Sequence, residues 1–273
     1  MIMTNANGYE MKETIKWYAN HARNFNLDRF TRDPSISLIV EQGEKAQLTD
    51  REMKAVLTRF PRNARARSLL RRIVWENPLW FSKLSLERGE AIPTLNVFDA
   101  ISHTAIVPSY TSYETDANER ALSADIHLYQ IQAPMPREIR RAIHAEGLAH
   151  EIGHTLLASP LYDGMKLKLP DGRVVESEQF LEELGLKAEN LIPVSNYALT
   201  VREGEFSGKP LPYKIKHGGK KYAMSEELAE TIAQMAMPFP LHNPNRLSRA
   251  ENLASRQEIV QGLELFLNAV RVK

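Results

Sequence analysis

The chain has 273 residues, of which 43% are hydrophobic and 25% charged, which excludes collagen-like, coiled-coil and wholly disordered proteins. The formal net charge is only +1, so charge gives no reason to expect nucleic acid or an acidic membrane as a partner. Cysteine is absent, which excludes disulfide scaffolds, thiol catalysis and cysteine-ligated metal sites.

No apolar stretch is long enough for a transmembrane helix, and the N-terminus lacks the apolar core of a signal peptide. The sequence therefore predicts a cytoplasmic protein with no membrane partner. Export as an effector, by a route without a readable signal, is left open. The oligomeric state cannot be read from the sequence.

Residues 1–90 are predicted to form a mainly helical N-terminal region, which would serve substrate recognition or packing. The pattern predicts a helix over 9–24 and a short strand over 35–40. Thr49 and Glu52 have the spacing of a capping box, which indicates a helix that begins there. A further helix is predicted over 61–76, from its spacing of leucine, isoleucine and valine.

A domain boundary is predicted at Gly89–Pro93, so that residues 91–273 form a second, α+β domain. The strands and hairpins predicted in it cover residues 94–98, 103–107, 125–131, 166–175 and 213–224. The helices predicted in it cover residues 137–159, 177–186, 225–237 (capped by Ser225) and 248–270.

One segment of the predicted helix over 137–159 contains the pattern H-E-x-x-H, which is typical of a catalytic metal site. His150 and His154 lie one turn apart, so both imidazoles project from one face and can bind a single Zn²⁺. Glu151 points toward a water on that metal and can accept its proton. The apolar neighbours indicate a buried helix, where two histidines and a glutamate are costly unless something satisfies them.

A catalytic zinc ion needs a third protein ligand and one open position. Glu226 is the predicted ligand, on the first turn of the helix that Ser225 would cap, and Glu227 is the alternative. Glu230 lies one turn further on the same face, where it could orient a liganding histidine. Asp163, in a turn after the first helix, is a weaker candidate.

With these residues the chain resembles the gluzincin metallopeptidases. In the lethal-factor-type branch, a Ser-x-Tyr element precedes Glu-x-x-Ala-Glu, and the present chain has Ser195-Asn196-Tyr197 followed by residues 226–230. The resemblance implies that Tyr197 assists the oxyanion. Because residues 198–224 separate the two elements, Tyr222 is the alternative.

The chain also resembles the metallopeptidases that cleave phage repressors or act in radiation responses. The shared features are an arginine-rich helix start, H-E-x-G-H and a Glu-x-x-Ala helix ending in Met-Pro, here Met237-Pro238. Both resemblances imply a zincin-like domain and a zinc-dependent endopeptidase acting on a protein or peptide. The strand at 125–131 could be the sheet edge that pairs with substrate, or a plain strand.

Six arginines between Arg59 and Arg72 suggest two other functions. They could bind an acidic protein substrate, or they could bind nucleic acid if the protein is a nucleic-acid-associated regulator. A solvated helix face is the simpler interpretation. Another alternative is a non-catalytic regulatory protein that retains the metallopeptidase fold. Glu151 argues against it, because such a protein has no need of the base.

Overall fold

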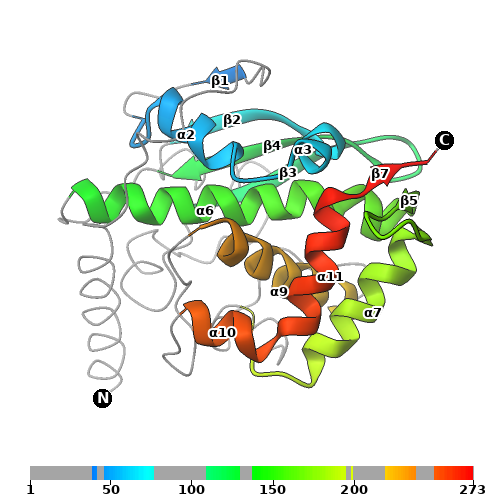
Figure 1. Cartoon of the computed structure of the whole chain (residues 1–273). Coiled ribbons are helices and arrows are strands. Elements are labelled where there is room, and N and C mark those ends of the chain that lie inside the picture. Colours follow the sequence, from blue (N-terminus) through cyan, green and yellow to red (C-terminus); the bar gives the residue numbers. More distant parts are fainter. Residues whose placement is uncertain are drawn as a thin grey trace, which may run out of the picture.

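The computed structural model describes residues 39–41, 46–76, 109–129, 137–194, 198, 219–237 and 249–272. These residues confirm the α+β class, because the long helix α6 (Arg137–Ala158) lies between a sheet and a group of further helices (Figure 1). No helix in these ranges is both long and apolar enough to cross a membrane.

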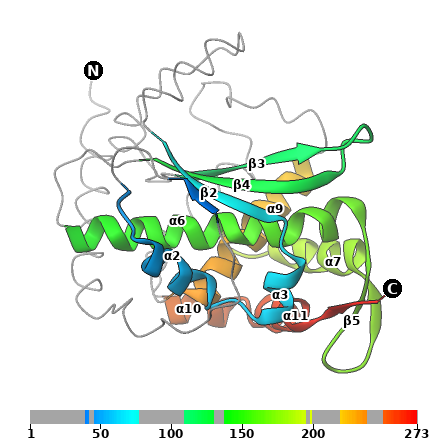
Figure 2. The same cartoon turned by 90° about the horizontal axis from the view of Figure 1, so that it is seen from above.

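The larger sheet contains β1 (Ile39–Glu41), β2 (Leu70–Glu76), β3 (Ser109–Thr115) and β4 (Ala121–Tyr129). In the described part of the chain the strand order is β1-β2-β4-β3, and only β3 runs antiparallel to its neighbour (Figure 2). Strand β4 is therefore interior, and β3 is the last strand of this sheet among the described residues. The expectation that the strand at 125–131 forms a sheet edge is wrong, because β4 is paired on both sides.

The segment 61–76, predicted as one helix, divides into helix α3 (Arg62–Arg67) and strand β2. Ile73 and Trp75 are both buried, with the half-buried Val74 between them, which is the alternation of a strand. β-Branched and aromatic side chains in succession also fit a sheet better than a helix. The spacing of the leucines and Ile73 is compatible with the period of a helix and with that of a strand. Pairing within the sheet decides in favour of the strand.

Helix α2 (Asp50–Leu57) begins at the predicted capping box. The Thr49 amide donates to Glu52 Oε2 at 2.8 Å, and the Glu52 amide donates to Thr49 Oγ1 at 3.3 Å. Helix α2 and strand β2 share one hydrophobic core with α6. The described residues before position 90 thus include strands as well as helices, and they belong to the same core as the later ones.

Several predictions fall outside the described residues. They are the helix at 9–24, the first residues of the strand at 35–40, the boundary at 89–93 and the strands at 94–98 and 103–107. The division into two domains therefore stays a prediction.

Two segments flank the end of α6. The π-helical turn η2 (Ser159–Asp163) follows it directly, and α9 (Gly219–Ala236) packs across it. Because α9 begins at Gly219, the hairpin predicted over 213–224 is helical from that residue on. Ser225 therefore lies inside the helix, and the predicted N-cap is wrong.

The remaining elements agree more closely with the sequence. They are β5 (Lys166–Lys168), β6 (Val174–Glu176), α7 (Ser177–Glu189), α10 (Arg249–Ser255), α11 (Gln257–Asn268) and β7 (Val270–Arg271). Strands β5 and β6 form the predicted hairpin, and Gly172 in its turn has a φ of 90°, which favours glycine. The predicted last helix is interrupted at Arg256, between α10 and α11.

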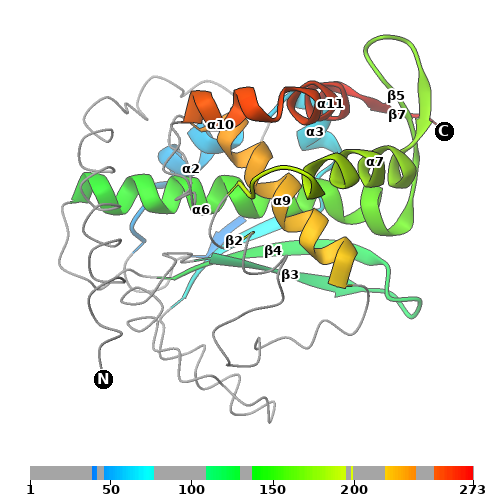
Figure 3. The same cartoon turned by 90° about the horizontal axis from the view of Figure 1, so that it is seen from below.

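Helices α6 and α9 approach each other closely where Gly153 meets Ala229 (Figure 3). A Cβ on Gly153 would lie 3.0 Å from both the Cα and the carbonyl oxygen of Ala229. Backbone atoms cannot move aside as a flexible side chain can. The glycine in H-E-x-G-H therefore permits this helix crossing.

We expect Gly153→Ala to push the two helices apart, to lower the free energy of unfolding by about 1–3 kcal/mol and to weaken Zn²⁺ binding. Urea unfolding and a chelator competition assay measure the two effects. Gly262→Ala is the control, because its Cβ would crowd only the Leu184 side chain. It should reduce stability and leave zinc binding intact. Equal zinc affinity in both variants would contradict the role of this crossing.

His144 is a buried residue of α6 that does not belong to the metal-binding face. Its Nε2 lies 2.5 Å from Gln47 Oε1, and its ring meets Trp75 edge-on at 4.8 Å between centroids. Burial, with a smaller contribution from Arg140, lowers the pKa of His144 to about 3. This imidazole is therefore neutral in the folded protein at any pH near neutrality.

This lowered pKa predicts a pH-dependent stability. Below the ordinary pKa of 6.5 the unfolded chain binds a proton at His144 that the folded chain does not bind until about pH 3. The free energy of unfolding should therefore decrease as the pH decreases. The contribution of His144 to this decrease is about 2 kcal/mol from pH 7 to pH 5. Urea unfolding of the wild type and of His144→Gln at both pH values tests this. An identical pH dependence in the two proteins would refute it.

Candidate metal centre

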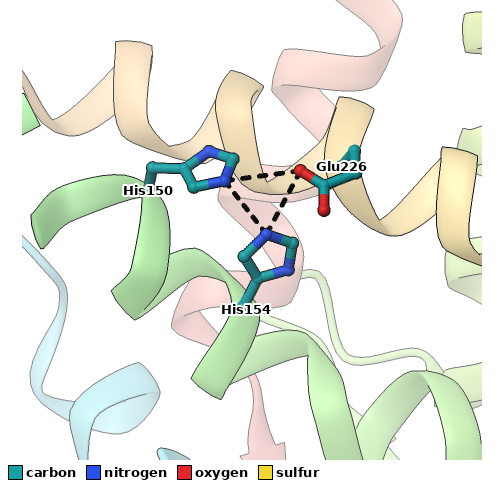
Figure 4. Close-up of side chains that lie close together, drawn as sticks. All are labelled: His150, His154 and Glu226. Carbon is teal, nitrogen blue, oxygen red and sulfur yellow. Dashed lines mark hydrogen bonds and ion pairs between the residues drawn. The ribbon is translucent and has the colours of Figure 1, made fainter. Parts of the chain in front are cut away.

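The two histidines of H-E-x-x-H are brought together as the sequence predicts. His150 and His154 lie one turn apart on α6, and their Nε2 atoms are 3.0 Å apart (Figure 4). The rings meet nearly at right angles, at 84°. His150 is buried and His154 is nearly so. Two ring nitrogens at this separation need a proton or a cation between them.

Glu226 on α9 completes the group. Its Oε2 lies 3.4 Å from His150 Nε2 and 3.3 Å from His154 Nε2, so that three ligand atoms form a closed triangle (Figure 4). In the described part of the chain this buried oxygen makes no hydrogen bond. The carboxylate and the imidazoles thus face one another inside the protein.

The dimensions of this triangle fit a small divalent ion. Ligand atoms about 2.0–2.1 Å from a tetrahedral zinc ion are about 3.3 Å apart, close to the three measured sides. Three protein ligands also leave one position of a tetrahedron open. The His150, His154 and Glu226 group could therefore hold a metal ion.

The positive and negative charges in this group of three side chains stabilise each other. Burial alone would lower the pKa of His154, but the Glu226 carboxylate, with Glu151, raises it to about 9. Burial likewise would raise the pKa of Glu226, but the two imidazoles hold it well below its usual range. Without a metal the His154 imidazole is thus protonated at neutral pH. A bound cation would take the place of that proton.

Glu151 lies beside the triangle and is not one of its ligands. Its two carboxylate oxygens accept hydrogen bonds from β3, from Ser109 Oγ at 3.0 Å and from Thr111 Oγ1 at 2.6 Å. The side chain is buried, so its orientation is fixed by these two hydroxyls. A general base needs this placement, close to the metal and held by other groups.

A hydroxyl on α9 orients one of the histidines. Ser225 Oγ lies 3.2 Å from His154 Nδ1. When Nε2 faces a metal, Nδ1 carries the proton and donates it to this oxygen. The sequence assigned such a supporting role to Glu230. Glu230 is buried one turn after Glu226, and its contact with a histidine stays a prediction.

Glu227, the alternative ligand, is engaged elsewhere. It forms a buried ion pair with Arg256, and its Oε1 also accepts the Val194 amide at 3.1 Å. Arg256 in turn donates to the Ile192 carbonyl at 2.7 Å. Glu227 therefore joins α9 to the segment after α7 and to the break between α10 and α11. Asp163, the other candidate, is exposed and lies outside the triangle.

The two tyrosines predicted to assist the oxyanion lie in different parts of the chain. Tyr197 lies outside the described residues, and Tyr222 lies on α9 one turn before Glu226. Among the described tyrosines, Tyr113 and Tyr162 lie near enough to Glu226 for its carboxylate to affect the pKa of their hydroxyls. Burial of the Tyr113 hydroxyl, together with the carboxylates of Glu151 and Glu226, raises its pKa well above the usual range.

The arginines between Arg59 and Arg72 do not form one free basic surface. Arg67 donates to the Phe266 carbonyl at 2.6 Å and stacks over that ring. Arg71 and Arg72 both pair with Asp125, at 3.2 Å and 2.5 Å. At least three of the six side chains thus have structural partners within the chain, so these three do not present free positive charges.

Comparison with known proteins gives no match: no family model, no curated protein and no solved structure corresponds to the chain. The functional argument therefore depends on the geometry of the site and on the sequence motif.

We expect Ser225→Ala to weaken Zn²⁺ binding by about tenfold or more, because His154 loses the group that fixes its ring orientation. Competition with a chromogenic chelator measures the affinity. Ser225→Thr, which keeps the hydroxyl, should bind Zn²⁺ nearly as the wild type does. If Ser225→Ala binds as tightly as the wild type, the serine does not orient the ligand.

Proposed function

We propose that this protein is a zinc-dependent endopeptidase that hydrolyses peptide bonds of a protein or peptide substrate. One observation carries the proposal: His150, His154 and Glu226 present three buried ligand atoms to one point, with the carboxylate of Glu151 beside them. Two imidazoles and one carboxylate are a ligand set of catalytic zinc sites. Imidazole ligands favour zinc over magnesium or calcium, which prefer oxygen.

The reaction follows from the roles of these residues. A zinc ion held by the three ligands would polarise a water molecule and the scissile carbonyl. Glu151 accepts the proton of the attacking water and returns it to the leaving amine. Ser109 and Thr111 hold the Glu151 carboxylate in place throughout, since each donates to a different oxygen.

The arrangement of elements supports a zincin-like fold of the gluzincin type. The helix with both histidines lies under a mixed sheet in which β3 is antiparallel, and α9 brings the third ligand from the other side of that helix (Figure 1). The motif in the sequence and the triangle in space are separate observations. Both favour the same class of enzyme.

We expect the zinc-loaded wild type to retain about one zinc ion per chain after desalting, measured by elemental mass spectrometry. Glu226→Ala should lose most of the metal. Glu151→Gln should keep it and lose hydrolysis by about 10²–10⁴-fold. Hydrolysis is measured by mass spectrometry of a proteome-derived peptide library after incubation with each protein.

Glu138→Gln is the matched control, because it makes the same change at an exposed position of the same helix. It should match the wild type in zinc content and hydrolysis. If the wild type binds no zinc, or Glu226→Ala binds it equally well, the assigned metal site is wrong. If zinc binds but the wild type cleaves no peptide that Glu151→Gln leaves intact, a non-catalytic metal protein is the better description.

A further inference from the structure

A buried ion pair joins α9 to the break between α10 and α11. Glu227 directly follows the ligand Glu226 on α9, and its carboxylate pairs with the guanidinium of Arg256. Both side chains are buried. A pair of charges inside a protein adds little net stability compared with apolar residues of the same size. Stability is therefore a weak explanation for this pair.

The contacts of the pair fix three segments relative to one another. Glu227 Oε1 also accepts the Val194 amide at 3.1 Å, and Arg256 donates to the Ile192 carbonyl at 2.7 Å. The guanidinium uses two of its nitrogens for two acceptors, and its planar fork makes both contacts directional. We call Glu227, Arg256 and the backbone of residues 192–194 the clamp.

Arg256 is fixed at the break by its own backbone. Its amide donates to the Leu253 carbonyl at 3.3 Å, and its carbonyl accepts the amides of Ile259 and Val260 at 2.9 Å and 3.0 Å. Helices α10 and α11 both contact α9, so the side chain of Arg256 reaches Glu227 from a neighbouring element (Figure 3). The clamp thus attaches α9 to a fixed point outside that helix.

The metal site needs such a fixed point. The crossing of Gly153 and Ala229 sets how closely α6 and α9 approach, but it offers little side chain to resist a rotation of α9 about its axis. A rotation of about 10° would move a carboxylate about 5–6 Å from the helix axis by about 1 Å. A liganding group has to stay within about 0.5 Å of its working position. Because Glu226 and Glu227 are adjacent, holding one limits the displacement of the other.

We propose that Arg256 is a positioning residue of the metal site. It acts through Glu227, which limits the rotation of α9 and so keeps the Glu226 carboxylate in the ligand triangle. The inference rests on the zinc site of the proposed function and is independent of the bond that is hydrolysed. The break between α10 and α11 thereby contributes to the geometry of the metal site.

Arg256→Lys tests this role while it keeps the positive charge. A lysine can still pair with Glu227, but a compact ammonium does not reproduce the fork of the guanidinium. We expect the affinity for Zn²⁺, measured by chelator competition, to fall by about tenfold. The visible absorption spectrum of the Co²⁺-loaded protein should also shift, because that spectrum reports the arrangement of the ligands around the metal.

Arg67→Lys is the matched control, because Arg67 also donates to a backbone carbonyl, that of Phe266 in α11. Its Zn²⁺ affinity and its Co²⁺ spectrum should equal those of the wild type. Glu227→Gln keeps an acceptor for the Val194 amide and removes the charge that Arg256 binds, so it should shift the spectrum as well. Circular dichroism and urea unfolding establish that each variant is folded.

The outcomes separate this inference from the proposed function. If the wild type binds neither Zn²⁺ nor Co²⁺, the metal site itself is wrong, and the clamp has nothing to position. If the wild type binds both and Arg256→Lys keeps the wild-type spectrum, the positioning role is overturned, even at a lower affinity. If neither clamp variant folds, or if Arg67→Lys shifts the spectrum equally, the pair serves the fold alone and the role is overturned too.

Discussion

The close crossing of α6 and α9 is the constraint on which the candidate site depends. The two histidines come from one helix and cannot complete a metal site by themselves, and the third ligand comes from a helix far along the chain. Gly153 lets the Ala229 backbone approach to a distance that a Cβ would forbid, and Glu226 lies less than one turn before Ala229. Local backbone packing thus sets the sides of the ligand triangle.

Burying these polar groups requires compensation, since an isolated charge inside a protein is strongly unfavourable. Without metal, a protonated His154 and an ionised Glu226 compensate each other, as their opposite pKa shifts indicate. A bound cation would take the place of that proton. Glu227 and Arg256 show the contrasting solution, in which a permanent buried ion pair holds the helices together and leaves no place for a ligand.

The motif-bearing part of the site could be predicted from the sequence, because the i, i+4 spacing of His150 and His154 is a property of any helix. Glu226 was predicted as an acidic residue on the first turn of a helix capped by Ser225, although the helix begins earlier, at Gly219. The supporting hydroxyls of Ser109 and Thr111 were not. Strand β3 consists of two serines, two threonines, two tyrosines and one glutamate and has no aliphatic run, and it pairs with β4 over its whole length. Local patterns cannot report such long-range pairing.

The location of β3 has a consequence for the chemistry. Among the described residues β3 pairs with β4 alone, and its side chains alternate between the two faces of the sheet. In β3 one of these faces carries the hydroxyls that hold Glu151 and then Tyr113 beyond the cover of α6. A change that shifted the register of β3 by one residue would turn all three side chains away from the metal centre at once. The groups that hold the base would therefore be lost, while the ligand triangle, which α6 and α9 form without β3, would remain.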